Sequence, residues 1–420
     1  MRFWFPAFLV LFEFSTYISN DMIMPGMPRV VHEFHVGIGS ASLALTAALL
    51  GNVALQWLLG PLSDYKGRRP VLLVGVAFFI ASCLGMFFAQ TMTQFVVLRG
   101  LQGMGCAFVA AVGYPSVQEA FDEATAVRTV ALMASVALLA PLLGPLLGAW
   151  VVTVWSWRMV FGVIAAIASI GFCGLWVNMP ETAGALAHRG TAPGSESGSA
   201  PRFTLRQLVR DYVPVLRNRR ILLGATALGF ACVPLMNWIA LAPVILIDQH
   251  HLTPLSYGWW QLPVFGAMIL GHVIVARVAG RWSLERLMRA GMIVMVAGVF
   301  AAYLGYVLTG AFTGAVTGFA IYALGLGPFY ASLYRQALFA SDGAKGAVAA
   351  AINTLFMLLM ALGVESSKSA YVAYGEPALL GAGAVAIVVA LFTARGFAHR
   401  MRVANRSEIF GAVATEGQLH

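Results

Sequence analysis

Two acidic residues lie in the first long apolar stretch of the chain, where they could bind protons or other cations. Glu13 and Asp21 occur in FLVLFEFSTYISNDMIMPGM, in which most other residues are apolar. An ionised carboxylate at mid-membrane depth costs roughly 2.5–3.5 kcal/mol, so acids in such positions usually face a water-filled cavity and carry out a function. The pair therefore predicts a transport site in which a carboxyl group holds either a proton or a positively charged ligand.

Helix geometry places further polar residues beside these acids. On an α-helix the two acids lie roughly 12 Å apart along the axis and about 80° apart around it. Tyr17 lies halfway between them, and Asn20 lies within about 20° of Glu13 around the axis. We expect these four residues to form one polar stripe that faces inward.

A basic residue in a later apolar stretch could balance the two acids. Arg99 lies in VLRGLQGMGCAFVAAVGYPSVQEAF, and Gln102 follows it one helical turn later. A guanidinium group inside a membrane needs partners or water, and the acids of the first stretch are credible counter-charges. The alternative is that the long Arg99 side chain reaches the outer membrane surface.

The composition indicates the elements that must position these residues. The chain has 420 residues, of which 60% are hydrophobic and only 10% are charged. Only helices and closed barrels satisfy their backbone groups in lipid, and apolar runs of about 20 residues indicate helices. We therefore predict an all-α membrane protein with twelve transmembrane helices. The predicted spans are 3–27, 41–62, 70–90, 93–117, 129–154, 159–178, 221–247, 257–279, 285–309, 311–334, 346–370 and 377–398.

The basic residues predict the orientation of these spans. All but four of the 26 Lys and Arg residues lie in the N-terminus, the even-numbered loops and the tail. Those segments, including both termini, are cytoplasmic by the positive-inside rule. The exceptions are Arg29, Arg99, Arg158 and Lys368. The net charge of +9 thus marks topology, and no clustered basic face with stacking aromatics indicates a nucleic-acid partner.

A small, polar segment divides the spans into two sets of six. AGALAHRGTAPGSESGSAP cannot form a core and predicts a flexible linker, and Arg202, Arg206 and Arg210 then share one face of a short helix on the cytoplasmic membrane surface. The chain should therefore be a duplicated transporter with two pseudo-symmetric halves. The predicted parts are an N-terminal half 1–182, a linker 183–219, a C-terminal half 220–398 and a cytoplasmic tail 399–420.

The loop after the second span, GPLSDYKGRRP, combines glycines with acidic and basic residues. Its glycines permit close helix approach and unusual backbone angles. We expect Asp64 to stabilise the N-terminus of a neighbouring helix and Arg68 to bridge to another acid. The alternative is ordinary positive-inside charge. The gating candidates are Gly60, Asp64, Gly67, Arg68 and Arg69.

The fifth span carries two prolines and two glycines at helical spacing, in ALLAPLLGPLLGAW. Proline frees backbone carbonyls and glycine lets another helix approach, so we expect a kinked and tightly packed helix. A helix that only packs is the alternative. The residues concerned are Pro141, Gly144, Pro145 and Gly148.

These motifs resemble those of the major facilitator superfamily. The loop after the second span resembles that family's cytoplasmic gate, although Tyr65 stands where a basic residue is usual. Arg99, Gln102 and Gly103 resemble its fourth-span motif, and Gly144, Pro145 and Gly148 its antiporter motif. Together with FEFSTYISNDMIMPGM, MPET and FASDGAKG, they resemble the family's twelve-span drug and proton antiporters along essentially the whole chain.

The resemblance implies roles for particular residues. Glu13, Asp21 and Arg99 would form the proton-coupling centre. It also implies efflux of chemically diverse, lipophilic and often cationic drugs across the bacterial cytoplasmic membrane, driven by the proton gradient without a cofactor, by a protein that acts as a monomer. The candidate substrate-binding residues are Tyr17, Asn20, Asp21, Tyr114, Asn237 and Trp238.

The remaining ionisable residues give weaker indications of function. His272 and Glu365 lie in apolar spans. We favour a packing role for His272 and a structural ion pair with Lys368 for Glu365. Glu119 is either a loop charge or an acid that senses the cytoplasmic cavity. His250 and His251 lack a matching ligand set, so we expect no metal site.

Two other classes of function compete with drug efflux. An enzyme would need a nucleophile with a base or a metal cluster, and no HxxxH, HExxH or GxSxG spacing occurs in a helix, so we expect none. A transporter of one sugar, nucleoside or monovalent cation is the stronger alternative. It would usually place several polar residues in one cavity.

Overall fold

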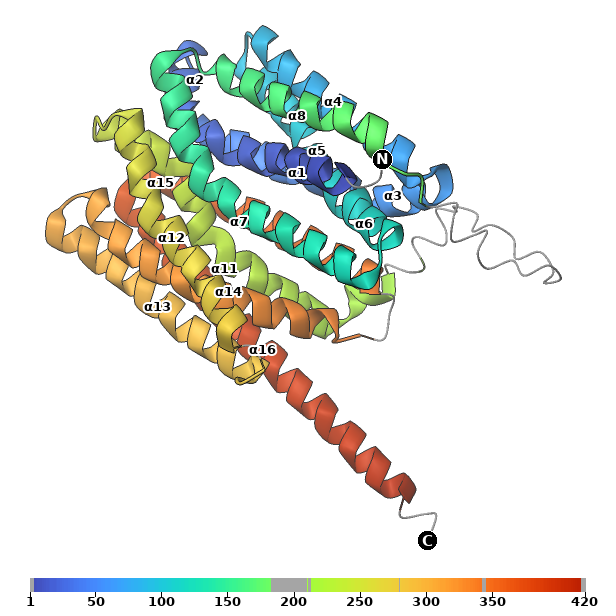
Figure 1. Cartoon of the computed structure of the whole chain (residues 1–420). Helices are drawn as coiled ribbons and strands as arrows, with labels where there is room; N and C mark the ends of the chain where they lie inside the picture. Colours follow the sequence, from blue (N-terminus) through green and yellow to red (C-terminus); the bar gives the residue numbers. More distant parts are fainter. Residues whose placement is uncertain (1–3, 183–209, 211–212, 279, 342–344, 417–420) are drawn as a thin grey trace. The chain divides into compact units, whose positions relative to one another are not determined.

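The described residues of the chain form mainly helices (Figure 1). The computed structural model describes residues 4–182, 210, 213–278, 280–341 and 345–416. The helices of the first part are α1 (Phe5–Met22), η2 (Met24–Gly26), α2 (Met27–Glu33), η3 (Ile38–Ser42), α3 (Leu43–Lys66), α4 (Arg68–Gly85), η4 (Met86–Phe88), α5 (Met92–Phe108), η5 (Val109–Gly113), α6 (Tyr114–Ala120), α7 (Glu123–Val154) and α8 (Arg158–Asn178). Those of the second part are α11 (Arg219–Pro243), η6 (Val244–Gln249), α12 (Pro254–Val278), α13 (Leu284–Thr309), η7 (Phe312–Ala315), α14 (Val316–Leu338), α15 (Lys345–Tyr374) and α16 (Glu376–Glu416).

The described residues contain 11 helical segments that are long and apolar enough to cross a membrane. They correspond to the second to twelfth predicted spans. The helix at the first predicted span, α1, is not among the 11, and it is the one that carries Glu13 and Asp21. The prediction of an all-α, multi-pass membrane protein is confirmed.

The chain divides into two compact units. Unit 1 comprises 1–207, 236–266 and 364–373, and unit 2 comprises 208–235, 267–363 and 374–420. Unit 1 therefore includes the end of α11, η6, the first part of α12 and part of α15. Most of the predicted linker and its surface helix lie outside the described residues, so the division into two six-helix halves stays a prediction.

The helix α16 is longer than the predicted twelfth span. That span was expected to end at 398, and α16 continues as a helix to Glu416, so the cytoplasmic tail 399–420 stays a prediction. The segment HRMRVANRSEIF lacks proline and glycine, so nothing in it interrupts a helix that a membrane span has already nucleated.

In unit 1, α1 is the central helix. It packs mainly against α7 and α8, while α5 packs against α3 and α4. Because several neighbours cover α1, the side chains of Glu13 and Asp21 are almost fully buried.

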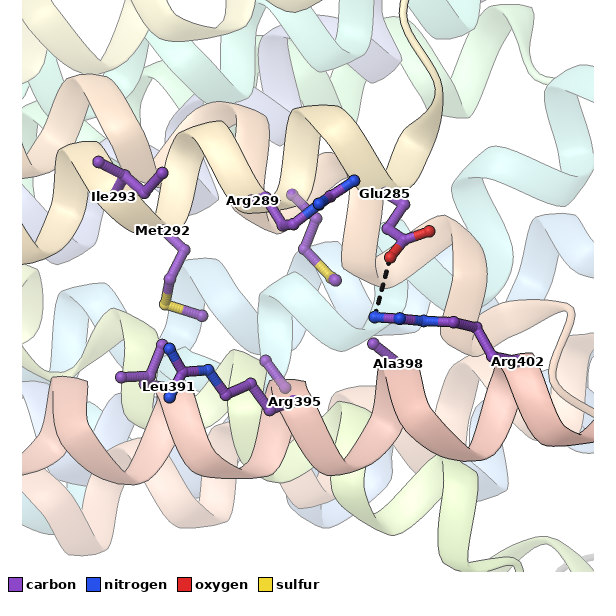
Figure 2. A pocket seen from close by; sticks show the side chains of 10 residues that line it. Glu285, Arg289, Met292, Ile293, Leu391, Arg395, Ala398 and Arg402 are labelled. Carbon is purple, nitrogen blue, oxygen red and sulfur yellow. Dashed lines mark ion pairs between the residues drawn. The ribbon is translucent and has the colours of Figure 1, made fainter.

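In unit 2, α13 packs along α14 and also contacts α16 (Figure 2). Gly298 and Gly318 lie in the contact between α13 and α14, where a side chain would meet the facing backbone. Small residues at such positions allow the close helix packing that stabilises membrane bundles.

Candidate functional site

Glu13 is buried at the centre of α1 and is held by a tyrosine from another helix. Its side chain is fully buried, and the Tyr114 hydroxyl donates a hydrogen bond of 2.8 Å to Oε1. The second oxygen, Oε2, has no hydrogen-bond partner among the described residues. This arrangement leaves one acceptor of a buried carboxyl available for a proton or a ligand.

A local break in helix geometry positions Tyr114. The fourth predicted span consists of α5, a π-helical stretch η5 (Val109–Gly113) and α6, which begins at Tyr114. Pro115 follows directly and lacks a backbone N–H, so a regular helix could not satisfy the carbonyl one turn earlier. A π-helical stretch is a common way to absorb such a defect near functional sites.

Arg99 is fully buried in α5 and joins three helices. Its guanidinium donates to the backbone oxygens of Ser19 in α1 and Ala44 in α3, each at 3.2 Å. It also donates to the side-chain oxygens of Gln102 and, at 3.4 Å, Asn20. The side chain therefore does not extend to the membrane surface.

The acids were expected to act as counter-charges for Arg99. Within the described part of the chain, Arg99 forms no ion pair with Glu13 or Asp21, but it lies within electrostatic range of Asp21. Backbone carbonyl oxygens and side-chain amide oxygens accept the hydrogen bonds of the guanidinium. The partial negative charges of these oxygens compensate the positive charge in a site from which water is largely excluded.

Asp21 lies where α1 meets α7. It is 5% exposed, and a Cβ added to Gly144 would lie 2.7 Å from the Asp21 Cβ. A Cβ added to Gly148 would lie 1.9 Å from the Met22 backbone oxygen. The two glycines of the fifth predicted span therefore form the surface on which this end of α1 rests, and α7 continues as a helix through Pro141 and Pro145.

Gly148→Ala is expected to disturb this contact. Because the added methyl would overlap backbone, α1 and α7 must move apart, and overpacking of this kind costs about 1–3 kcal/mol. We expect a lower melting temperature in detergent and reduced transport. Gly60→Ala is the matched control because a Cβ there meets nothing within 4 Å. Equal stability of the two variants would contradict the assigned contact.

The predicted ligand-binding residues of the seventh span are buried in unit 1. The Trp238 ring nitrogen donates to Gln261 Oε1 at 2.6 Å. Neither amide atom of Asn237 has a hydrogen-bond partner among the described residues, and the Gln261 Nε2 also lacks one. Buried amides without partners are uncommon and are available to a ligand or water.

Tyr17 and Asn20 complete the predicted stripe on α1. Both side chains are half-buried, whereas Glu13 and Asp21 are buried. Residues on every side of α1 are buried, among them Phe12 and Ile18, so burial does not single out one face and the inward-facing stripe stays a prediction. Tyr257 of α12, which the sequence did not single out, lies within electrostatic range of Asp21.

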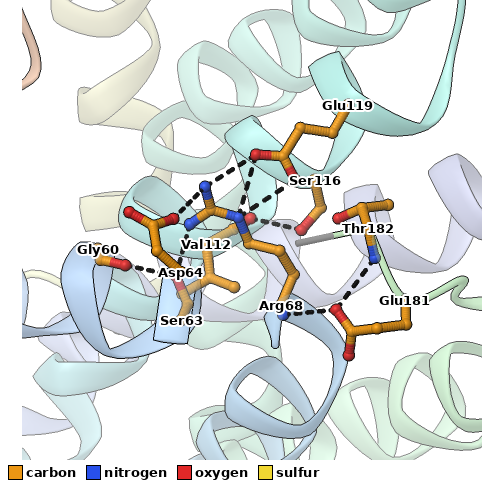
Figure 3. Close-up of polar contacts among 9 residues, drawn as sticks. All are labelled: Gly60, Ser63, Asp64, Arg68, Val112, Ser116, Glu119, Glu181 and Thr182. Carbon is orange, nitrogen blue, oxygen red and sulfur yellow. Dashed lines mark hydrogen bonds and ion pairs between the residues drawn. The ribbon is translucent and has the colours of Figure 1, made fainter. Parts of the chain in front are cut away.

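The loop motif forms a polar network around Arg68 (Figure 3). The Arg68 guanidinium contacts Glu119 at 2.8 Å and Asp64 at 2.5 Å. Its backbone N–H donates to Glu181 Oε1 at 2.8 Å, and Gly67 takes a positive φ of 101° to make this turn. The expected bridge from Arg68 to another acid is confirmed, and that acid is Glu119. Helix capping by Asp64 stays a prediction.

The other gating candidates lie around this network. Gly60 accepts a hydrogen bond of 2.8 Å from the Ser63 hydroxyl, which in turn accepts one from Arg68 (Figure 3). Arg69 donates to the Trp176 backbone oxygen at 2.6 Å, which ties the loop to the end of α8.

Glu119→Gln is expected to destabilise the protein more than Asp64→Asn. The Glu119 side chain is 16% exposed and that of Asp64 54% exposed. Loss of a charged partner from a nearly buried guanidinium costs about 1–3 kcal/mol, whereas an exposed ion pair contributes about 0–1 kcal/mol. Melting temperatures of the two variants in detergent check this order. A larger loss in Asp64→Asn would mean that Asp64, not Glu119, is the main partner of Arg68.

The other three exceptions to the positive-inside pattern are each held by a local partner. Arg29 donates to the Val152 backbone oxygen at 2.6 Å. Lys368 pairs with Glu365, as expected, and Glu365 also accepts hydrogen bonds from Ser42 and Thr46 of unit 1. These basic residues therefore have structural roles.

Arg158 pairs with Glu33, which follows α1 outside the candidate spans. The Arg158 guanidinium and the Trp157 ring nitrogen each donate to the Glu33 carboxylate at 2.6 Å. Burial raises the pKa of Glu33, but these hydrogen bonds and the Arg158 charge outweigh it, so the pKa is lowered overall. This cluster fixes the start of α8 against α2.

His272 is hydrogen-bonded within its own helix, and the packing role favoured from the sequence stays a prediction. It is half-buried in α12, and its Nδ1 hydrogen-bonds the Met268 backbone oxygen at 2.9 Å. That bond lies within its own helix.

Sequence reasoning missed several partners of the site. Glu181 belongs to MPET, a segment whose only signal was its resemblance to other antiporters. Gln261 is one of few amides in an apolar span, which is a signal that could have paired it with Trp238. Ser42 and Thr46 carried no signal, because hydroxyl residues are common in membrane helices.

Comparisons with known proteins agree with this architecture. Residues 9–364 match the model of the Major Facilitator Superfamily. The chain is 45% identical over 368 residues to "Multidrug transporter MdfA" of Yersinia pestis bv. Antiqua (strain Angola), and this alignment covers 87% of each chain. It is 45% identical over 373 residues to the protein of that name from Escherichia coli O6:H1, and this alignment covers 89% of this chain and 88% of the other.

Solved structures of low sequence identity share the fold. A bacterial homologue of the human lysosomal transporter Spinster, in an inward-facing and unoccupied conformation, aligns with a TM-score of 0.69 at 14% identity, covering 94% of this chain and 96% of the other. The xylose transporter XylE from E. coli aligns with a TM-score of 0.69 at 16% identity, covering 94% and 97%. Together with the match over most of its length, this shows that the chain is a member of the major facilitator superfamily.

Proposed function

We propose that this protein exports chemically diverse, lipophilic and often cationic drugs from the cytoplasm in exchange for protons. The observation that carries the proposal is the pair of buried carboxyl groups on α1. Buried acids in membrane helices mark proton or cation pathways. The 45% identity to proteins named multidrug transporters, over most of the chain, supports drugs as the substrates.

The two carboxyl groups have different neighbours, which suits a division between proton binding and the binding of a cationic ligand. Glu13 accepts a hydrogen bond from Tyr114 and retains one acceptor without a partner among the described residues. Asp21 makes no ion pair with any described residue, so its charge is available to a cationic ligand or a proton. Competition between a proton and a cationic drug for such an acid couples the two flows.

The setting and the transport cycle follow from the family and the charge pattern. We place the protein in the bacterial inner membrane with both termini in the cytoplasm, in keeping with the positive-inside pattern. It acts as a monomer, needs no cofactor and carries out no enzymatic reaction. Alternating access occurs through rocking of two six-helix halves around the site, with the network of Arg68 and Glu119 as part of the cytoplasmic gate.

Everted membrane vesicles test the function directly. Respiration acidifies their lumen, so an exporter that exchanges protons for drug should raise the luminal pH when ethidium or chloramphenicol is added. Vesicles without the protein are the control. Drug uptake without a pH change would refute proton coupling. A response to sodium or a sugar but to neither drug would favour the narrow-substrate alternative, for which Asn237 and Gln261 supply hydrogen-bonding groups.

A further inference from the structure

The segments at the ends of the first and seventh predicted spans contact one another. α2 follows the first span and η6 completes the seventh, and the two elements pack together within unit 1. The positive-inside rule places both span ends on the periplasmic side. The contact therefore joins the first predicted half to the second on the outer side of the membrane.

A histidine and an aspartate form an ion pair in this contact. His32 Nε2 lies 2.6 Å from Asp248 Oδ1. The His32 side chain is 66% exposed and that of Asp248 is 21% exposed, so the imidazole exchanges protons with the surrounding water. An imidazole changes its charge between about pH 5 and 8, and the attraction across this contact increases when it takes up a proton.

The other charged groups near His32 have partners of their own. Asp248 is the only carboxylate within ion-pair distance of His32 in the described part of the chain. Glu33 pairs with Arg158, and Arg29 donates to the backbone of α7. η2 and η3, which also pack against α2, carry no ionisable side chain. The remaining titratable or charged residues of these outer segments are His35, His250, His251 and Lys368.

A second contact on the same side contains no histidine. Glu365 of α15 accepts hydrogen bonds from Ser42 at 3.1 Å and from Thr46 at 2.6 Å, all three within unit 1. These residues lie near the predicted outer ends of the eleventh and second spans. The contact also joins the two predicted halves, and it serves as a reference for a tie in which no imidazole takes part.

We propose that His32 and Asp248 form an outer clasp that external acid tightens. The clasp rests on the proposed transport function, in which the outer side opens to release drug and the pair separates. A proton on His32 adds a charge–charge attraction that exists only while the outer side is closed. This added stability is present at low pH and is lost as pH rises through the titration of the histidine. An acid exterior therefore supplies protons for exchange and also favours the closed outer side.

Pulsed EPR distances between two spin labels test the clasp without drug or a proton gradient. Cysteines that replace Gly37 and Leu255 carry the labels, because a Cβ at Gly37 meets nothing within 4 Å and Leu255 is 45% exposed. Serine replaces the exposed native Cys173. The full-length protein is measured in lipid nanodiscs at about pH 5.5 and about pH 7.5, on either side of the usual histidine titration. We expect acid to raise the ratio of closed to open forms about two- to fivefold more in the parent than in His32→Gln.

Matched variants separate the clasp from the acids of the transport site, which also respond to pH. His32→Gln, Asp248→Asn and the double variant should show the same reduced pH response, because each removes the same pair. His35→Asn should keep the parental response, since this exposed histidine has a φ of 51°, which asparagine tolerates. Thr46→Val should lower the closed fraction by the same factor at both pH values, because its contact contains no imidazole.

Three results would overturn the clasp: a parental pH response in His32→Gln, an equal loss of response in His35→Asn, or additive effects of His32→Gln and Asp248→Asn. A single distance in the parent at both pH values would overturn it as well. Drug export does not enter this measurement. A response that depends on His32 in a protein that exports no drug would therefore refute only the proposed substrates, and drug export without that response would refute only the clasp.

Discussion

Arg99→Ala is expected to eliminate drug transport, with drug accumulation in everted vesicles falling to the level of vesicles without the protein. The guanidinium donates to the backbone of α1 and α3 and to the side chains of Gln102 and Asn20. Each buried acceptor left without a donor costs about 1–3 kcal/mol. The loss would also remove a positive charge that acts on Asp21.

Arg99→Lys separates charge from geometry. Lysine keeps the charge, but its three donors radiate from one nitrogen and cannot reproduce the planar fork that reaches several acceptors. We expect partial recovery of transport and of the melting temperature. Transport is normalised to the amount of folded protein, measured by size-exclusion chromatography in detergent. Full activity in the alanine variant would show that the bracing of α1, α3 and α5 by Arg99 is dispensable.

Asp21→Asn is expected to abolish the proton-coupled export of cationic drugs and to impair neutral drugs much less. The substitution retains the size of the side chain, so the fit against Gly144 and α7 is preserved. It removes the charge that a cation would approach in a buried site, and the loss of such an attraction lowers affinity by at least about tenfold. Ethidium and chloramphenicol uptake into energised vesicles measures the difference.

Two controls make the Asp21 experiment specific. Ser15→Ala removes a buried hydroxyl of the same helix that donates to the Phe12 backbone oxygen, without removing a titratable acid, so it should keep the proton response to ethidium. Binding of ethidium without a proton gradient separates coupling from affinity. Unchanged resistance to cationic drugs in Asp21→Asn, at normal abundance in the membrane, would refute the role of Asp21.

The sequence by itself was sufficient for the fold and for the helix that carries the site. Apolar runs of membrane-spanning length predict the helices, because backbone groups in lipid must be paired within each segment. The cost of burying charge singles out Glu13, Asp21 and Arg99 without any structure. Helical spacing also groups the polar residues of α1, but α1 is buried on every side, so burial alone does not mark their face.

Only the tertiary structure decided which residues these side chains meet. Arg99 binds backbone oxygens rather than the acids, Tyr114 reaches Glu13 after a π-helical stretch, and Arg68 pairs with Glu119. The physical reason is that lipid and the protein interior are both apolar, so hydrophobic periodicity does not tell which face of a membrane helix meets a neighbour. The rotation and spacing of the helices come instead from close packing, as between Gly148 and the backbone of α1. Contacts set by packing depend on the whole bundle and cannot be derived from one helix at a time.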